Sequence, residues 1–264
     1  MSNKLSDDLK AIISGASSGA IGFSITLPID YIKQHMQTNR TFTQVMKDVE
    51  VNGTKILFRG GTIGLTSIAP QMAIKYYAFH KFNYSDNVFT KPVSAFGAGL
   101  VDGAFLGPVL AFQSFRQMNV VNQKVNYKTI VSHNFAPLMV PMALRNATYT
   151  SSILGGYFII KEKLFSNKPL SFFQNILIGS ILNVPATLFC SPFDVLRANH
   201  NNQLLNYQIN HPLTKPCLKK ITLDIYKKNG FKGFYTGYPS LLVNFALRFP
   251  LTLALQFEIL KLIS

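Results

Sequence analysis

Uncharged, largely apolar runs alternate with short polar segments along the whole chain. Six such runs occur, each with at most one internal charge, and each is close to the ~20 residues that a helix needs to cross a bilayer. Their Gly, Ser and Pro content keeps the hydropathy of each run modest. The pattern predicts an all-α membrane protein with six transmembrane helices, over residues 11–29, 60–74, 92–115, 129–160, 169–193 and 233–257.

Small residues lie four apart within two of these runs, as Gly15 with Gly19 and as Gly99 with Gly103. Such pairs let two helix backbones approach closely where lipid supplies no hydrophobic drive. We therefore expect close helix–helix packing at both pairs.

The composition favours a membrane environment. Of 264 residues, 48% are hydrophobic and 14% are charged, which is too few charges for an ordinary soluble domain. The formal net charge is +15. The basic residues gather in loops, without aromatic side chains interleaved on one face, which argues against a nucleic-acid partner. Three connections between the runs are basic, and we expect them to lie on one side of the membrane, in contact with anionic lipid. The two termini are then expected on the other side. The basic residues are Lys47, Lys55 and Arg59 in the first connection, Lys124 and Lys128 in the second, and Lys215, Lys219, Lys220, Lys227, Lys228 and Lys232 in the third.

One proline motif recurs at a fixed place in the runs. Pro28 is followed by Asp30 and Lys33, and Pro192 is followed at the same spacing by Asp194 and Arg197. The middle copy is worn, because Pro108 keeps only a glutamine nine positions on, as Gln37 follows Pro28. The prolines are 80 and 84 residues apart. One domain, residues 1–264, is therefore predicted to contain three two-helix repeats, at about residues 8–85, 90–165 and 168–264.

A second element repeats in the first and third copies. Asn-Gly is followed seven residues later by another glycine, which closes an aromatic-led turn. The glycines are Gly53 and Gly60 in the first copy, and Gly230 and Gly237 in the third.

Together these motifs resemble the mitochondrial carrier family, whose mark is Pro-x-acid-x-x-base-x-base-x-Gln on each odd helix, then a short matrix helix and an aromatic-base-Gly turn. The resemblance covers essentially the whole chain. It implies three pseudo-symmetric repeats around a central cavity, with short helices on the matrix side. It further implies a monomer in the mitochondrial inner membrane, in contact with cardiolipin, that moves a small solute by alternating access. Another organelle membrane remains open at this stage.

The resemblance also implies a matrix gate built from the motif residues. Proline removes a helical hydrogen bond and bends the helix, so Pro28, Pro108 and Pro192 are expected to draw three helices together. In the family the acid of one odd helix pairs with the base of the next. Carried over here, Asp194 pairs with Lys33, Asp30 faces Gln113, and Arg197 faces Leu110. The predicted matrix gate is Asp30, Lys33, Gln37, Gln113, Gln117, Asp194 and Arg197.

At the opposite face the family has an aromatic-acid-x-x-base gate on the even helices. The corresponding positions here are His80, Lys161, Glu258 and Lys261. They offer no acid–base pair between helices. This departure from the family predicts a weak cytoplasmic gate, and exchange less strict than in the family.

Four charges lie inside the runs, namely Lys75, Asp102, Arg145 and Arg248. A charge within the bilayer costs about 2.5 kcal/mol or more, so such residues usually face a polar cavity. Three positive charges against one negative favour an anionic ligand. Snorkelling to the interface is the alternative for Lys75.

Arg145 and Asn146 fall where the family has its second substrate contact. An Arg followed by a polar residue there resembles carriers of carboxylates and keto acids, whereas nucleotide carriers tend to have Gly and an aliphatic residue. A guanidinium can bind a carboxylate with two parallel hydrogen bonds, which explains the association. The predicted substrate site is Arg145, Asn146, Lys75 and Arg248.

Other functional classes remain to be weighed against a carboxylate carrier. No nucleophile with an adjacent base, Gly-rich phosphate loop, cofactor motif or metal-ligand spacing is recognisable, so an enzyme is not expected. A carrier of nucleotides or other phosphate-bearing substrates could use the same basic residues. The worn motifs leave a third class open, a carrier-like adaptor that has lost transport.

Overall fold

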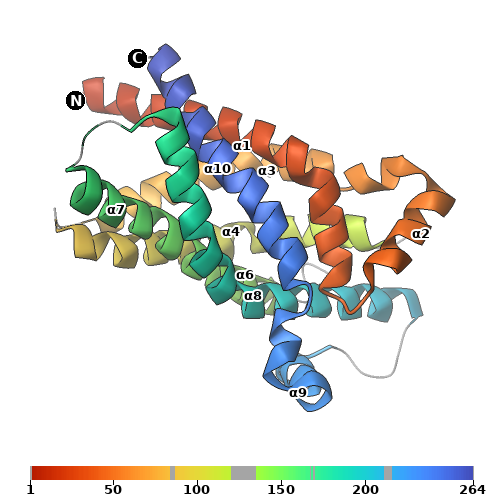
Figure 1. The fold of residues 1–264 in the computed structure, drawn as a ribbon. Coiled ribbons are helices and arrows are strands. Elements are labelled where there is room, and N and C mark those ends of the chain that lie inside the picture. The colour runs from red at the N-terminus through yellow and green to blue at the C-terminus, as the bar shows by residue number, and fades with distance from the viewer. Residues whose placement is uncertain are drawn as a thin grey trace.

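The structure is a computed structural model that describes residues 2–83, 87–119, 135–166, 168, 170–210 and 216–263. Within these ranges the chain forms helices and turns and no strand (Figure 1). The all-α prediction is therefore confirmed for the described residues. The helices are α1 (Ser2–Met36), α2 (Phe42–Asn52), η1 (Thr54–Phe58), α3 (Gly61–Phe82), η2 (Val88–Thr90), α4 (Lys91–Met118), α6 (Phe135–Thr150), η3 (Ser151–Gly155), α7 (Gly156–Phe165), α8 (Phe172–Asn210), α9 (Leu218–Asn229), η4 (Gly230–Tyr235) and α10 (Tyr238–Ile263).

The long helices pack against one another in chain order. α1 contacts α3, α3 contacts α4, α4 contacts α6, α6 contacts α8, and α8 contacts α10, which returns to α1. The contacts therefore close into a ring. Figure 1 shows the two termini side by side at one end of this ring, whereas α2 and α9 lie away from them.

Four stretches among the described residues are long and apolar enough to cross a membrane. They are Ile12–Met36, Val88–Met118, Phe172–Tyr207 and Leu218–Leu262. The expected spans in α3 and α6 do not reach that standard. α3 carries Gln71 and Lys75, and α6 carries Arg145 and Asn146, which lower the hydropathy of these helices.

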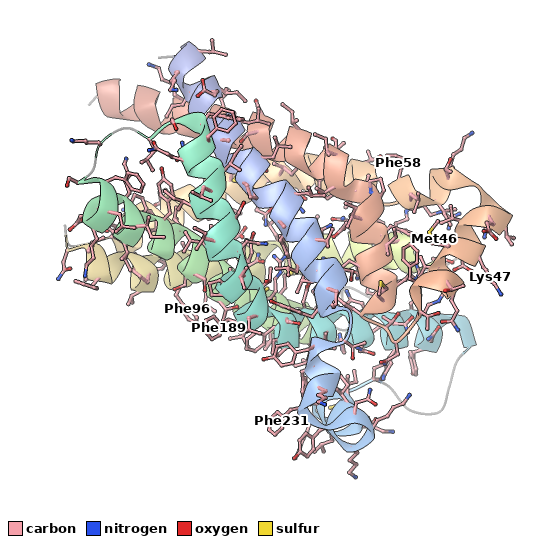
Figure 2. The ribbon with its side chains drawn as sticks, in the orientation of Figure 1. Met46, Lys47, Phe58, Phe96, Phe189 and Phe231 are labelled. Carbon is pink, nitrogen blue, oxygen red and sulfur yellow. The ribbon has the colours of Figure 1, made fainter. Side chains whose placement is uncertain are left out.

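Many polar side chains are buried alongside the apolar core, and many large apolar side chains are exposed. Gln34, Gln37 and Asp194 are buried between helices, while Phe96, Phe189 and Phe231 lie on the outside (Figure 2). An apolar exterior is suited to lipid.

All three motif prolines lie inside helices, Pro28 in α1, Pro108 in α4 and Pro192 in α8. α1 visibly changes direction along its length in Figure 1. The bends at the individual prolines stay predictions. Further prolines lie within α3, α6, α8 and α10, as Pro70, Pro141, Pro185 and Pro250.

The close packing expected at Gly99 and Gly103 is confirmed. Both glycines of α4 face the backbone of α6, and a Cβ atom added to Gly103 would lie 2.5 Å from Ala143 Cα. Because a side chain at either position would push the helices apart, α4 and α6 can approach closely only with glycine there.

The two copies of the glycine turn have the same local structure. Gly60 and Gly237 adopt left-handed φ angles of 75° and 76°, each after a 3₁₀ turn and directly before a long helix. Glycine adopts this conformation without the Cβ clash that other residues meet. A Cβ at Gly60 would lie 3.0 Å from the Gln113 carbonyl oxygen, and one at Gly237 would lie 3.1 Å from the Gln37 nitrogen. The two turns therefore pack on glutamines of the expected matrix gate, Gln113 of α4 and Gln37 of α1.

Candidate functional site

A cavity of about 400 Å³ lies between the helices, within the roughly 300–1,000 Å³ range of small-molecule sites. Side chains from α1, α3, α4, α6, α7, α8 and α10 line it. Its lining includes Asp30 and Arg197 of the proline motifs, and also Phe158 and Lys161 of α7. The cavity therefore extends from the motif charges to the even-helix residues.

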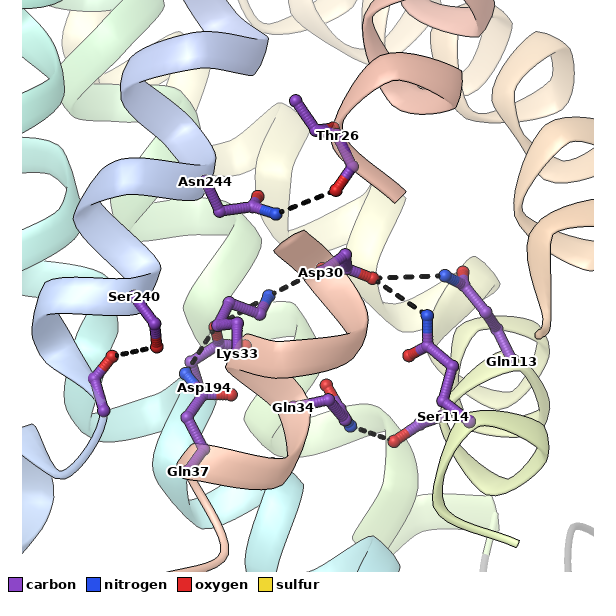
Figure 3. A network of polar contacts seen from close by, with 12 residues as sticks. Thr26, Asp30, Lys33, Gln34, Gln37, Gln113, Ser114, Asp194, Ser240 and Asn244 are labelled. Atoms are coloured by element: carbon purple, nitrogen blue, oxygen red, sulfur yellow. Dashed lines mark hydrogen bonds and ion pairs between the residues drawn. The ribbon is translucent and has the colours of Figure 1, made fainter. Parts of the chain in front are cut away.

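A network of buried polar contacts joins α1, α4 and α8 beside the cavity (Figure 3). At its α4 side, Asp30 forms an ion pair with Lys33 of its own helix at 3.0 Å. Gln113 and Gln117 of α4 donate hydrogen bonds to the same carboxylate at 3.4 and 3.2 Å. We call this network the polar cluster; it comprises Asp30, Lys33, Gln34, Gln37, Gln113, Ser114, Gln117, Asp194 and Arg197.

Asp194 is the centre of the α8 side of the polar cluster. It is fully buried. Lys33 lies 3.6 Å from it, Arg197 3.0 Å and Arg145 3.7 Å, and Gln37 donates a hydrogen bond at 3.1 Å. Three cations therefore share one carboxylate, which is how a buried charge in a low-dielectric site is offset.

The structure brings together all seven residues of the expected matrix gate. Lys33 pairs with Asp194 and Gln113 contacts Asp30, as the family pattern implied. Leu110 and Arg197 both line the cavity, and the expectation that they face each other stays a prediction. Leu110 offers no acceptor, so Arg197 pairs with Asp194 of its own helix and donates to the side-chain oxygen of Gln34.

The sequence reasoning missed three polar partners in this region. Gln34 donates a hydrogen bond to Ser114, and Asn199 donates to the Gln37 carbonyl oxygen at 3.0 Å. The signal available was their position next to expected gate residues, since Gln34 follows Lys33, Ser114 follows Gln113, and Asn199 lies two residues after Arg197. Their inward direction follows from the packing of α1 against α4 and α8.

The four expected substrate-contacting residues all line the cavity. Lys75 of α3 does not snorkel; its ammonium lies 3.6 Å from the buried carboxylate of Asp102 on α4. Asn146 and Gln71 donate hydrogen bonds to the same Asp102 oxygen at 3.0 and 3.4 Å. A mid-span acid therefore ties α3, α4 and α6 together beside the cavity.

Arg145 is held from several sides. It donates a hydrogen bond to the Asn146 side-chain oxygen at 2.7 Å. Its guanidinium lies 5.4 Å from the Tyr149 ring centre and 5.0 Å from that of Phe245, within cation–π distance. With the 3.7 Å approach to Asp194, these contacts fix the guanidinium at the junction of the cavity and the polar cluster.

Arg248 lines the cavity without a direct ion pair among the described residues. Its guanidinium lies 4.8 Å from the centre of the Phe23 ring. No carboxylate of the described residues is within 4.0 Å of it. Asp30 acts on it electrostatically from a greater distance, so an entering anion would meet a charge that has no direct ion pair among the described residues.

Basic groups exceed acidic groups in and directly around the cavity. Among the described residues there are six basic side chains and three acidic ones, a formal excess of three positive charges. They are Lys33, Lys75, Arg145, Lys161, Arg197 and Arg248, against Asp30, Asp102 and Asp194.

The expected cytoplasmic gate shows no contact between helices among its described members. Glu258 and Lys261 pair with each other at 2.8 Å on the exposed surface of α10, and Lys161 lines the cavity. The side chain of His80 lies outside the described residues. Instead, the Phe79 ring of α3 stacks on the Phe158 ring of α7, with centroids 5.7 Å apart.

Comparison with known proteins agrees with this architecture. The family description "Mitochondrial carrier protein" matches residues 6–85 and 168–255. The mitochondrial aspartate-glutamate transporter AGC1 of Saccharomyces cerevisiae is 22% identical over 97% of this chain, which spans only 31% of that protein's length. An uncharacterized mitochondrial carrier of Schizosaccharomyces pombe is 24% identical over 89% of this chain and 87% of its own. A mitochondrial adenyl nucleotide antiporter of Xenopus laevis, SLC25A24-A, is 29% identical, over 28% of this chain and 17% of its own.

The family match covers both repeats in which the proline motif keeps its acid and its base. Proteins of this family are transporters of the mitochondrial inner membrane and not enzymes, which confirms the predicted localisation. With the closed helical ring and the central basic cavity, the match identifies the chain as a member of the mitochondrial carrier family.

Proposed function

We propose that the chain carries a small anionic metabolite across the mitochondrial inner membrane by alternating access. The observation that carries the proposal is the positive excess of the cavity, with Arg145 fixed at its wall and Arg248 without a direct ion pair among the described residues. Buried charges of one sign are costly unless a ligand of the opposite sign visits them. An anion entering between the helices would supply that charge.

The same proposal includes the number of spanning helices and their arrangement in repeats. We take the ring as six spanning helices, α1, α3, α4, α6 with α7, α8 and α10, in three repeats of one domain, residues 1–264. The similar glycine turns of the first and third repeats support it, since they pack on Gln113 and Gln37, two glutamines of the expected matrix gate. The short helices α2 and α9 then lie on the matrix side, and the protein acts as a monomer.

Di- and tricarboxylates and keto acids are the favoured substrates. Arg145, Asn146, Lys75 and Arg248 present two planar guanidinium groups, an ammonium and an amide to one cavity. Guanidinium groups recognise carboxylates through paired hydrogen bonds. The likeness to an aspartate-glutamate transporter supports a substrate bearing carboxylates.

The polar cluster would be the matrix gate of this cycle. Its ion pairs support this role, because Lys33, Arg197 and Arg145 share Asp194. A substrate carboxylate bound to Arg145 would compete with Asp194 for its guanidinium and so weaken the cluster. The even-helix residues His80, Lys161, Glu258 and Lys261 would form the weaker cytoplasmic gate.

A nucleotide or other phosphate-bearing substrate is the second candidate. The local likeness to an adenyl nucleotide antiporter favours it. Against it, the second contact position holds Arg145 and Asn146 instead of a glycine and an aliphatic residue. A non-transporting adaptor is the third candidate, and the surface pair of Glu258 and Lys261 favours it because that pair joins no helices.

Uptake into liposomes tests the proposal. The purified protein is reconstituted and offered labelled citrate, malate, 2-oxoglutarate, phosphate and ATP. A carboxylate should be taken up, and Arg145→Ala or Arg248→Ala should slow uptake about tenfold or more, since a hydrogen bond to a charged group contributes ~1.5–3 kcal/mol. Arg116→Ala is the control, because Arg116 is exposed and does not line the cavity.

Each outcome decides between the candidates. Uptake of ATP but of no carboxylate would show that the site binds nucleotides instead of carboxylates. Failure of the wild type to take up any of the five compounds would exclude transport of these classes. Undiminished uptake by Arg145→Ala would remove Arg145 from the substrate site.

A further inference from the structure

Asp102 is a buried acid that neither the proline motif nor the polar cluster uses. It lies on α4 between Gly99 and Gly103, and its exposed fraction is 0%. Lys75, Gln71 and Asn146 all direct their polar atoms at one oxygen, Oδ2. The contacts of this carboxylate are therefore one-sided.

The other oxygen, Oδ1, is buried without a hydrogen-bond partner among the described residues. A buried carboxylate that is to stay ionised needs both oxygens satisfied, because a bare charge in a low-dielectric site is strongly destabilised. The charge of Asp102 thus depends on the nearby ammonium of Lys75. Oδ1 is the vacant position at which a proton can bind.

Lys75 is shared between Asp102 and the cavity. Its side chain is 22% exposed and lines the cavity, while its ammonium lies 3.6 Å from Asp102. An anion in the cavity would compete with Asp102 for this ammonium. Two carboxylates beside one cation repel each other, which favours protonation of the more buried one.

The other charged groups around Asp102 do not alter this argument. Arg145 of α6 faces it through Asn146, which accepts from Arg145 and donates to Asp102. The acids and bases that α1 and α8 bring to α4 pair within the polar cluster instead, and Lys161 of α7 lines the cavity. Among the described residues, Lys75 therefore holds the charge of Asp102 most directly.

We propose that Asp102 is a proton-binding site and that the chain carries its anion together with a proton. The proposal rests on the proposed transport function. The proton comes from the water on the side to which the cavity is open and binds Oδ1 as the anion takes Lys75. On the other side the anion leaves, Lys75 returns to Asp102, and the proton is released to water. By linkage, a bound proton raises the affinity for the anion by the same factor as the anion raises the affinity for the proton.

Proton-driven uptake tests this inference. Wild-type liposomes are given labelled malate, or whichever of the five compounds above is taken up, with an outside pH about 1.5 units below the inside. Potassium and valinomycin clamp the membrane potential. One proton per anion over this gradient supports accumulation of roughly thirtyfold, as each 1.4 kcal/mol is a factor of ten. An internal pH dye should report acidification that follows uptake.

Two substitutions and a control separate a proton site from a structural ion pair. Asp102→Asn keeps the shape but cannot exchange a proton, so uptake should continue without accumulation and without acidification. Asp102→Glu should restore both. Asp224→Asn makes the same chemical change on exposed α9, away from the cavity, and should behave as wild type.

The results distinguish this inference from the transport function itself. Wild-type uptake that ignores the pH gradient would overturn the proton site and leave the transporter standing. Gradient-driven accumulation that persists in Asp102→Asn would also overturn it, since the proton would then travel elsewhere. If Asp102→Asn does not fold, the inference is decided by whether wild type and Asp102→Glu accumulate the anion along the pH gradient. No uptake of any anion by wild type would remove both proposals.

Discussion

Asp194 receives contacts from more charged side chains than any other acid of the polar cluster. Lys33, Arg197 and Arg145 approach it from three helices, and no part of its side chain is exposed. Removing one member of a buried ion pair leaves the others uncompensated, which costs about 3–5 kcal/mol. The stability of the closed arrangement should therefore be unusually sensitive to this carboxylate.

Asp194→Asn should lower the thermal stability of the protein in detergent. The amide cannot balance three cations, and the expected loss is about 3 kcal/mol. A fluorescence melting curve measures it. Glu258→Gln is the matched control, because its pair with Lys261 is on the surface, where such pairs contribute little. Equal melting temperatures for Asp194→Asn and wild type would contradict the central place given to Asp194.

At the residue scale, sequence reasoning found the charged members of the polar cluster but not all of their partners. The proline spacing was sufficient to place Asp30, Lys33 and Asp194 at one level. The partners of Arg197 were not predicted, because Leu110 stands where symmetry would supply an acid. The side chain then takes the nearest acceptors, Asp194 and Gln34, and which acceptors are near depends on how α1 packs against α8.

At the element scale, α4 and α6 are joined by a glycine face. An added Cβ at Gly103 would be 2.5 Å from the nearest α6 atom, Ala143 Cα, whereas at Gly107 it would be 3.1 Å from Met139 Cα. The two positions lie on the same helix and differ mainly in how closely the neighbour approaches. The same substitution at the two positions therefore tests how closely α6 packs against each part of α4.

Gly103→Ala should destabilise the protein more than Gly107→Ala. Overpacking of this kind costs about 1–3 kcal/mol, while the gain in helix propensity is the same for both substitutions. Melting temperatures of the two variants, measured in one detergent, compare them directly. A smaller loss for Gly103→Ala than for Gly107→Ala would show that α6 is not held against Gly103.

The π-helical turn η3 could not be predicted from the sequence. Residues 129–160 form one run whose single charge is Arg145, so hydrophobic periodicity gives no sign of an interruption. The wider turn at Ser151–Gly155 changes the direction of the side chains that follow. Ile153, Leu154, Tyr157 and Phe158 then all line the cavity.

At the scale of the whole molecule, an apolar exterior is combined with a net charge of +15. Much of the charge lies on exposed connections, including Lys219, Lys220, Lys227 and Lys228 of α9. Anionic headgroups attract such residues by about 1 kcal/mol per basic side chain near the surface. Cardiolipin, with two phosphates, remains the expected lipid partner.

Cardiolipin added to detergent micelles should raise the melting temperature, and phosphatidylcholine at the same concentration should not. A lipid that binds the folded state stabilises it by mass action. The increase should shrink at high salt because exposed charges are screened. Equal stabilisation by both lipids would show that headgroup charge is not what the protein recognises.

The all-helical fold could be predicted from the apolar runs, and the repeat was inferred from prolines and glycines, which act on the backbone directly. The matching φ angles of Gly60 and Gly237 support the repeat for its first and third copies. Repeat two was the weakest prediction, since it keeps Pro108 and Gln117 but no acid. The basic connection expected there, with Lys124 and Lys128, lies outside the described residues.

The three seams of the polar cluster differ in chemistry. α1 meets α8 through the ion pair of Lys33 with Asp194, and α1 meets α4 through the amides that bind Asp30. α4 meets α8 through apolar contacts of Phe115 and its neighbours. Within the polar cluster, α4 is therefore the helix that can move away from the other two without breaking an ion pair. The polar cluster is thus expected to open by movement of α4 away from α1 and α8, which stay together. An equal outward movement of all three helices is not expected.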